Sequence, residues 1–84
     1  MKMEFIKNYI KRINKDDIKY FLEDNDIYLD DEIINSLLVI VKNDYENIIN
    51  EDEVILKKIK DLIKEDNYNK LLSILRKYKD LYIK

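Results

Sequence analysis

Apolar residues recur every three or four positions along most of this chain, the spacing that places them on one face of an α-helix. Five such segments are separated by clusters of Asp and Asn, residues that favour turns and helix ends. The pattern predicts helices over residues 3–12, 15–24, 31–43, 51–64 and 66–82. We therefore expect an all-α fold, a compact bundle of four to five short helices in a single domain spanning residues 1–84.

The ends of these helices are marked by side chains that can satisfy free backbone groups. The residues predicted to cap helix starts are Asn14, Asp30 and Asn50. Asp17 and Glu53 stand three residues after the first and last of these, as the acidic member of a capping box does. Asn25 is expected to take the left-handed conformation that ends the second helix.

The third segment is the most apolar, and it should be the centre of the bundle. Its apolar residues are Ile33, Ile34, Leu37, Leu38, Ile40 and Val41. A helix that is apolar on this much of its surface must be covered by neighbours. The first helix is expected to turn Phe5 and Tyr9 to its apolar face, and the second to bury Phe21. Between the second and third helices, residues 27–29 form a short extended link with Tyr28 outward.

The last helix carries an apolar arc of about half its circumference, wider than one neighbouring helix needs. Tyrosine is frequent at protein interfaces because its ring buries a large area while its hydroxyl stays hydrated. Candidate residues for protein contact are Tyr68, Leu72, Tyr78, Leu81 and Tyr82. The alternative is that the arc wedges between two other helices of the same chain.

The residue types that perform most enzyme chemistry are missing. The chain contains no His, Cys, Gly, Pro or Trp. Ser36 and Ser73 are therefore without an imidazole base, and the carboxylate clusters coincide with predicted helix starts, where capping and the helix dipole account for them. We expect no catalytic residue, no enzyme activity and no cofactor.

A metal site is also not expected. In the calcium-binding loop of EF-hands a glycine occupies position six and a bidentate Glu position twelve, counted here from Asp24 at the start of the acidic stretch that includes Glu32. Leu29 and Asn35 stand at those two positions. The stretch is better explained as the end of one helix and the start of the next.

Charge is unevenly distributed although the net charge is only −2. Residues 1–14 carry four Lys/Arg and one Glu (+3), residues 15–53 three Lys and thirteen Asp/Glu (−10), and residues 54–84 nine Lys/Arg and four acids (+5). The ends can fold back on the middle and reduce self-repulsion. Alternatively, a basic face of the last two helices can bind nucleic acid. Its candidate residues are Lys57, Lys58, Lys60, Lys64, Arg76 and Lys77.

The compartment follows from what the chain does not contain. No apolar run approaches the roughly 18 residues of a membrane span, and the N-terminus has no long apolar stretch. The lack of Cys suits a reducing compartment. A cytoplasmic protein is expected.

Five short stretches resemble the YqfT-like family of small proteins from low-GC Gram-positive bacteria, which carry a domain of unknown function. The stretches lie within residues 13–63 and are Ile13–Ile18, Asn25–Glu32, Val39–Val41, Asn50–Glu53 and Leu56–Ile59. The resemblance implies an all-helical fold and such a bacterial source, and it implies no activity. Together with the residues, it leads us to expect a non-enzymatic protein that acts through protein–protein contact, with a partner or as a homo-oligomer. Nucleic-acid binding is the alternative.

Overall fold

The computed structural model describes residues 3–82, and all of the regular structure in that range is helical. The helices are α1 (Met3–Arg12), α2 (Lys15–Asp24), α3 (Asp31–Ile49), α4 (Glu53–Ile63) and α5 (Glu65–Tyr82). The predicted all-α fold of short helices is confirmed.

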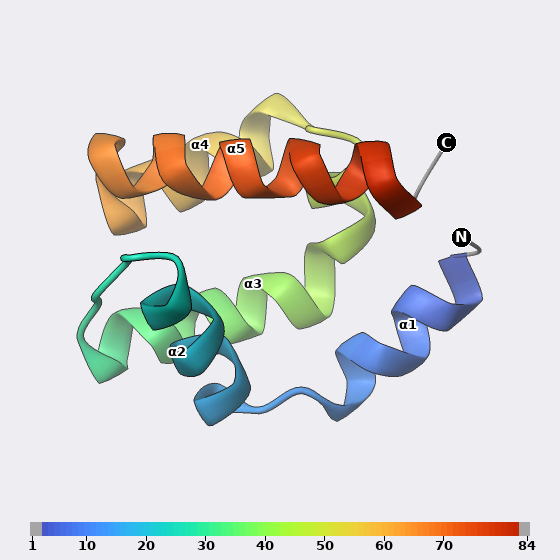
Figure 1. Cartoon of the computed structure of the whole chain (residues 1–84), viewed down its shortest axis with the longest axis horizontal. Helices are drawn as coiled ribbons and strands as arrows, with labels where there is room; N and C mark the ends of the chain where they lie inside the picture. The colour runs from blue at the N-terminus through green and yellow to red at the C-terminus, as the bar shows by residue number, and fades with distance from the viewer. Residues whose placement is uncertain (1–2, 83–84) are drawn as a thin grey trace.

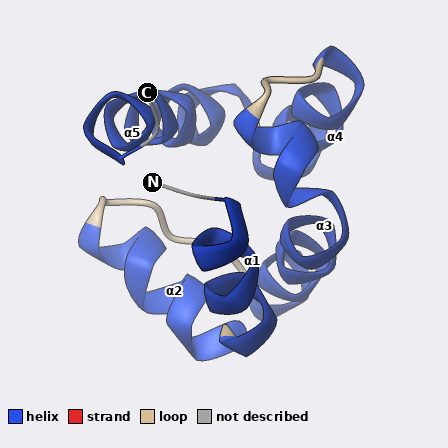
Figure 2. Ribbon diagram, turned by 90° about the vertical axis from the view of Figure 1, so that its right-hand side faces the viewer, coloured by secondary structure: helices blue, strands red, loops and turns tan. Residues whose placement is uncertain are grey.

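The helices are arranged around α3, which packs against α1, α2 and α4. In Figure 1, α3 crosses the middle of the molecule, with α1 and α2 below it and the α4–α5 hairpin above it. α5 packs mainly on α4, whereas α1 and α2 pack on α3. Figure 2 shows the consequence: α5 lies above the α1–α2 pair in this view, and α3 and α4 join them on the right.

The start of α2 is the capping box that the sequence predicts. The Asn14 N–H donates to Asp17 Oδ2 over 2.9 Å, and the Asp17 N–H donates to Asn14 Oδ1 over 3.0 Å. Each side chain thus satisfies a backbone donor that the helix leaves free.

The chain reverses after α2 one residue later than predicted. Asn25 does not take the left-handed conformation (φ −109°), and its side-chain amide donates to Phe21 O over 2.8 Å. Asp26 is the left-handed residue, with φ 61°. Ile27 then turns inward with no exposed surface and Tyr28 outward, as expected of an extended link.

The helix α3 continues six residues beyond the predicted end at residue 43. Asp44 departs from helical geometry (φ −127°, ψ 23°) and makes a kink, after which the helix resumes to Ile49. The continuation brings Ile48 against the core. Asp30 stands at the N-cap position but makes no side-chain capping bond.

The cap of α4 is Asp52 and not Asn50. Asp52 Oδ1 accepts hydrogen bonds from the N–H groups of Val54 and Ile55. Asn50 instead closes the preceding helix, since its N–H donates to Glu46 O. The prediction was wrong here because α3 is longer than its apolar stretch indicates.

Seven buried residues form the core cluster, and they come from α2, α3, α4 and the link between α2 and α3. They are Leu22, Ile27, Ile34, Leu37, Ile55, Ile59 and Ile63. α5 contributes no buried side chain among residues 65–81, although Tyr68, Leu71 and Ile74 pack on the cluster from outside. One side of the α5 apolar arc therefore remains uncovered.

Candidate functional site

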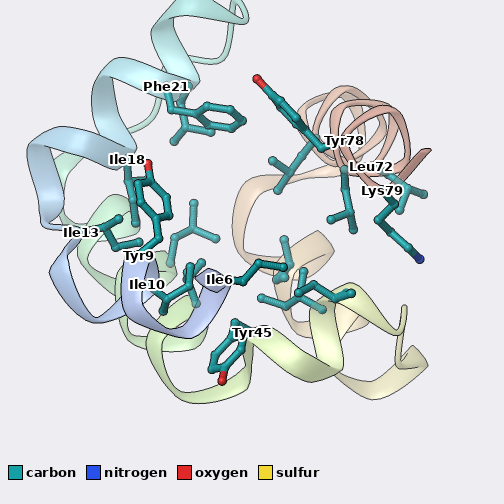
Figure 3. A pocket seen from close by; sticks show the side chains of 18 of the residues that line it. Ile6, Tyr9, Ile10, Ile13, Ile18, Phe21, Tyr45, Leu72, Tyr78 and Lys79 are labelled. Atoms are coloured by element: carbon teal, nitrogen blue, oxygen red, sulfur yellow. The ribbon is translucent and has the colours of Figure 1, made fainter. Parts of the chain in front are cut away.

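A cavity of about 570 Å³ lies between α5 and the α1–α2 pair, with α3 and α4 contributing the remaining walls. Its wall is apolar almost throughout. The two charged residues among those that line it are Asp17 and Lys79. We call this cavity the groove; Figure 3 shows that side chains from α1, α2, α3 and α5 converge on it.

Four aromatic side chains that line the groove are also well exposed to solvent. Their exposed fractions are Phe5 64%, Tyr9 61%, Phe21 36% and Tyr78 46%. They come from three helices, α1, α2 and α5. Folded proteins bury such rings where they can, so a group of them around one apolar cavity marks a surface suited to contact with another molecule.

Two contacts join α5 directly to the segment containing α2. The rings of Phe21 and Tyr78 lie with their centroids 6.3 Å apart at a tilt of 40°, a favourable aromatic geometry. Lys70 Nζ donates to Asp26 O over 2.9 Å. These contacts link the two sides of the molecule while leaving the cavity between them unfilled.

α5 is also held by ion pairs to Glu51, which lies in the link between α3 and α4. Its carboxylate accepts hydrogen bonds from Lys79 Nζ (2.9 Å) and from two guanidinium nitrogens of Arg76 (2.9 and 3.1 Å). These hydrogen bonds, that from Lys79 first, hold the pKa of Glu51 below its ordinary value. Glu51 itself has φ 55°, a left-handed conformation.

Three polar side chains of the groove, Asp17, Lys79 and Tyr45, are engaged within the chain. Asp17 belongs to the α2 capping box, and Lys79 is paired with Glu51. Tyr45 donates its hydroxyl proton to Glu46 Oε1 over 3.2 Å. Burial is the main cause that raises the pKa of Tyr45, and the neighbouring Glu46 adds to it.

The five residues predicted for protein contact fall into three groups. Tyr68, Leu72 and Tyr78 line the groove. Leu81 is 60% exposed and lies outside the lining. The side chain of Tyr82 lies outside the described part of the chain.

The contribution of α1 and α2 to the groove is not among the sequence-based predictions. The sequence predicts Phe5 and Tyr9 on the apolar face of their helix and Phe21 buried, whereas all three are exposed at the groove. The spacing of apolar residues carries no signal of this, because it does not show whether a neighbouring helix covers a given face.

The residues predicted for nucleic-acid binding lie on α4, directly after it and on α5, and some of them have partners within the chain. Lys57, Lys58, Lys60 and Lys64 are all exposed on or just after α4, with Asp61 among them. The ammonium of Lys60 lies 5.9 Å from the ring centroid of Tyr68. On α5, Arg76 is bound to Glu51, and Lys77 is exposed. Nucleic-acid binding by these cations stays a prediction.

Neither metal-ligand clusters nor membrane spans occur in residues 3–82. No group of three or more acidic side chains there is placed to hold a metal ion. No helix in the same range is both long and apolar enough to cross a bilayer. Ser36 donates its hydroxyl proton to Glu32 O over 3.1 Å, a bond within its own helix.

Comparison with known proteins provides no relative for this chain. No family model, curated protein or solved structure matches it. The resemblance to the YqfT-like family stays a prediction.

Proposed function

We propose that this protein acts by binding protein, and that its groove receives the exposed apolar stripe of a helix. The observation that carries the proposal is the apolar cavity of about 570 Å³ lined by four exposed aromatic side chains. Helix-in-groove recognition uses apolar anchors spaced three or four residues apart, which enter a hydrophobic channel between other helices. Aromatic side chains such as those of Phe5, Tyr9, Phe21 and Tyr78 are enriched in the cores of protein interfaces, and tyrosine is among the residues that dominate their binding energy.

The chemistry of the groove favours binding over catalysis. Its two charged residues, Asp17 and Lys79, are held by a capping box and an ion pair. An enzyme needs a titratable group free to meet its substrate, and this wall supplies apolar contact instead. We therefore infer a non-enzymatic protein. The cytoplasm is the compartment we propose, since a chain without cysteine needs no oxidising environment.

Nucleic-acid binding through Lys57, Lys58, Lys60, Lys64, Arg76 and Lys77 has less support. Arg76 donates both of its hydrogen bonds to Glu51. Asp61 interrupts the lysines of α4. A surface that binds successive phosphates of a nucleic acid is favoured by adjacent cations that are not already paired with carboxylates.

The proposal is tested with two fluorescein-labelled peptides of identical composition. One is an amphipathic helix with Leu along a single stripe, and the other is a scramble that spreads the same leucines around the helix. We expect fluorescence anisotropy to detect binding of the first peptide only. Phe21→Lys should weaken that binding by roughly tenfold or more, because it places a charge at the groove.

The matched control is Val54→Lys, which changes an exposed apolar residue on α4 that does not line the groove. It should leave peptide binding unchanged. Equal affinity for the two peptides, or equal loss in both variants, would show non-specific adhesion and contradict the proposal. So would binding of decanoic acid with no binding of either peptide, which would indicate a small-molecule site.

A further inference from the structure

The helix α1 presents an exposed stripe beside the groove. Phe5, Tyr9 and Arg12 are spaced four and three residues apart, so they lie along one line on the helix. All three are exposed, and both rings line the groove. The stripe combines two aromatic rings with a cation at the end of the helix.

The helix α2 presents a second exposed stripe with the same spacing and the opposite charge. Asp17, Phe21 and Asp24 are spaced four and three residues apart and are exposed. Asp17 and Phe21 line the groove. This stripe is an aromatic ring between two carboxylates.

Arg12 and Asp24, at the ends of these stripes, form no ion pair within residues 3–82. The cations of α5 differ, since Arg76 and Lys79 are both bound to Glu51. The basic N-terminal helix thus has charge available for another molecule.

We propose that the occupant of the groove is a second copy of this chain, in a two-fold dimer that pairs the α1 stripe of each copy with the α2 stripe of the other. Tyr9 of one copy packs on Phe21 of the other, and Arg12 lies against Asp24. A two-fold axis makes each contact twice. The inference rests on the proposed function and names the partner.

A second copy fits the surface better than an unrelated helix does. An occupant must offer carboxylates to α1 and cations to α2 while covering aromatic rings on both. One helix from another protein meets one stripe, whereas a second copy meets both by symmetry. Opposite charges across the contact also set its register and suppress wrong pairings.

Light scattering and analytical ultracentrifugation test the dimer. We expect a mass of about 20.6 kDa, twice the 10.3 kDa of the chain, at low salt and micromolar concentration. Added salt should shift the protein towards the monomer by screening the Arg12–Asp24 contacts. A mass of 10.3 kDa over the whole accessible concentration range would overturn the inference.

Charge reversal tests the arrangement itself. Arg12→Glu and Asp24→Arg should each weaken self-association by roughly tenfold or more, because each makes two like-charge contacts per dimer. An equimolar mixture of the two variants should recover the dimer, since the introduced glutamate meets the introduced arginine while the second contact stays native. Misfolding cannot produce that recovery. The control Lys58→Glu, on the exposed side of α4, should keep the wild-type dissociation constant.

The outcomes separate this inference from the proposed function. If the chain stays monomeric but binds the amphipathic peptide through Phe21, the groove binds protein and the second copy is not its partner. If the dimer forms and the mixture shows no recovery, the pairing of α1 with α2 is wrong. If neither the peptide nor a second copy binds, both proposals fall.

Discussion

At the scale of single residues, Asn and Asp side chains mark the helix ends of this chain, which has no glycine or proline, by hydrogen bonds to backbone groups. Asn14 and Asp52 cap helices with their side chains, and Asn25 binds the last turn of α2. Three residues with positive φ, Asp26, Glu51 and Lys64, make the sharp reversals. The helix boundaries of this protein therefore depend on a few polar side chains.

The capping box of α2 gives the first residue-scale prediction. Asn14→Ala removes the acceptor for the Asp17 N–H and should lower the free energy of unfolding by about 0.5–2 kcal/mol. Urea denaturation followed by circular dichroism measures the change. The control Asn43→Ala, at an exposed position inside α3, should be neutral or slightly stabilising, because Ala is the better helix former. An equal loss in both variants would show that the cap contributes nothing.

At the scale of elements, the junction between α4 and α5 is a single residue. Lys64 has φ 76° and ψ 165°, a region that is populated almost only by glycine. In this conformation the chain reverses and α5 runs back along α4. Arg76 and Lys79 therefore reach Glu51 at the opposite end of the hairpin. Lys64 sets the turn between the two helices, and the contacts of Arg76 and Lys79 with Glu51 hold α5 in that direction.

Lys64→Gly should therefore stabilise the protein. Relief of backbone strain, typically 1–3 kcal/mol, exceeds the extra entropy that glycine loses on folding, so we expect a gain of about 1 kcal/mol. Lys58→Gly, in the middle of α4, is the comparison and should destabilise by about 1 kcal/mol. Thermal and urea unfolding measure both. A loss of stability in Lys64→Gly would show that the junction is not strained.

At the scale of the whole molecule, Glu51 links the C-terminal part of α5 to the α3–α4 connection. The strength of this link depends on pH, because the carboxyl group of Glu51 must be ionised to make it. The pKa of Glu51 is lowered by hydrogen bonds from Lys79 and Arg76. A lowered pKa in the folded chain means that the ionised carboxylate favours folding. That contribution is present above the ordinary pKa of 4.5 and is lost as the pH falls through the lower pKa of the folded state.

We expect Glu51→Gln to be less stable than the wild type at neutral pH and to approach it as the solution is acidified below pH 4.5. Urea midpoints measured over a pH series give the comparison. Asp61→Asn, which removes an exposed carboxylate with no ion pair among residues 3–82, should follow the wild-type curve. A constant difference between Glu51→Gln and wild type at every pH would contradict the titration argument.

The charge asymmetry of the sequence is resolved in two different ways in the structure. The basic C-terminal third does fold back on the acidic middle, through the contacts of Arg76 and Lys79 with Glu51 and of Lys70 with Asp26 O. The basic N-terminal helix α1 also packs on this middle, through α3, but its Arg12 forms no ion pair within residues 3–82. The C-terminal third thus contacts the middle through ion pairs, whereas Arg12 remains exposed.

The sequence by itself determined the local features of this protein, because they depend on neighbours along the chain. The five helices, the box formed by Asn14 and Asp17, and the outward turn of Tyr28 each follow from residue types a few positions apart. The predicted end of α3 and the predicted start of α4 were wrong. α3 continues beyond its apolar stretch to Ile49, and Ile48 packs on the core.

The tertiary structure decided which apolar faces are covered. Phe5, Phe21 and Tyr78 lie on apolar stripes with the same three- and four-residue spacing as the stripes that form the core. The spacing of apolar residues does not show whether a neighbouring helix covers a stripe. That depends on how the helices cross, and here α5 packs on α4 while α1 and α2 pack on α3. The groove lies between α5 and the α1–α2 pair, which pack on different helices of the bundle, and no local pattern encodes that arrangement.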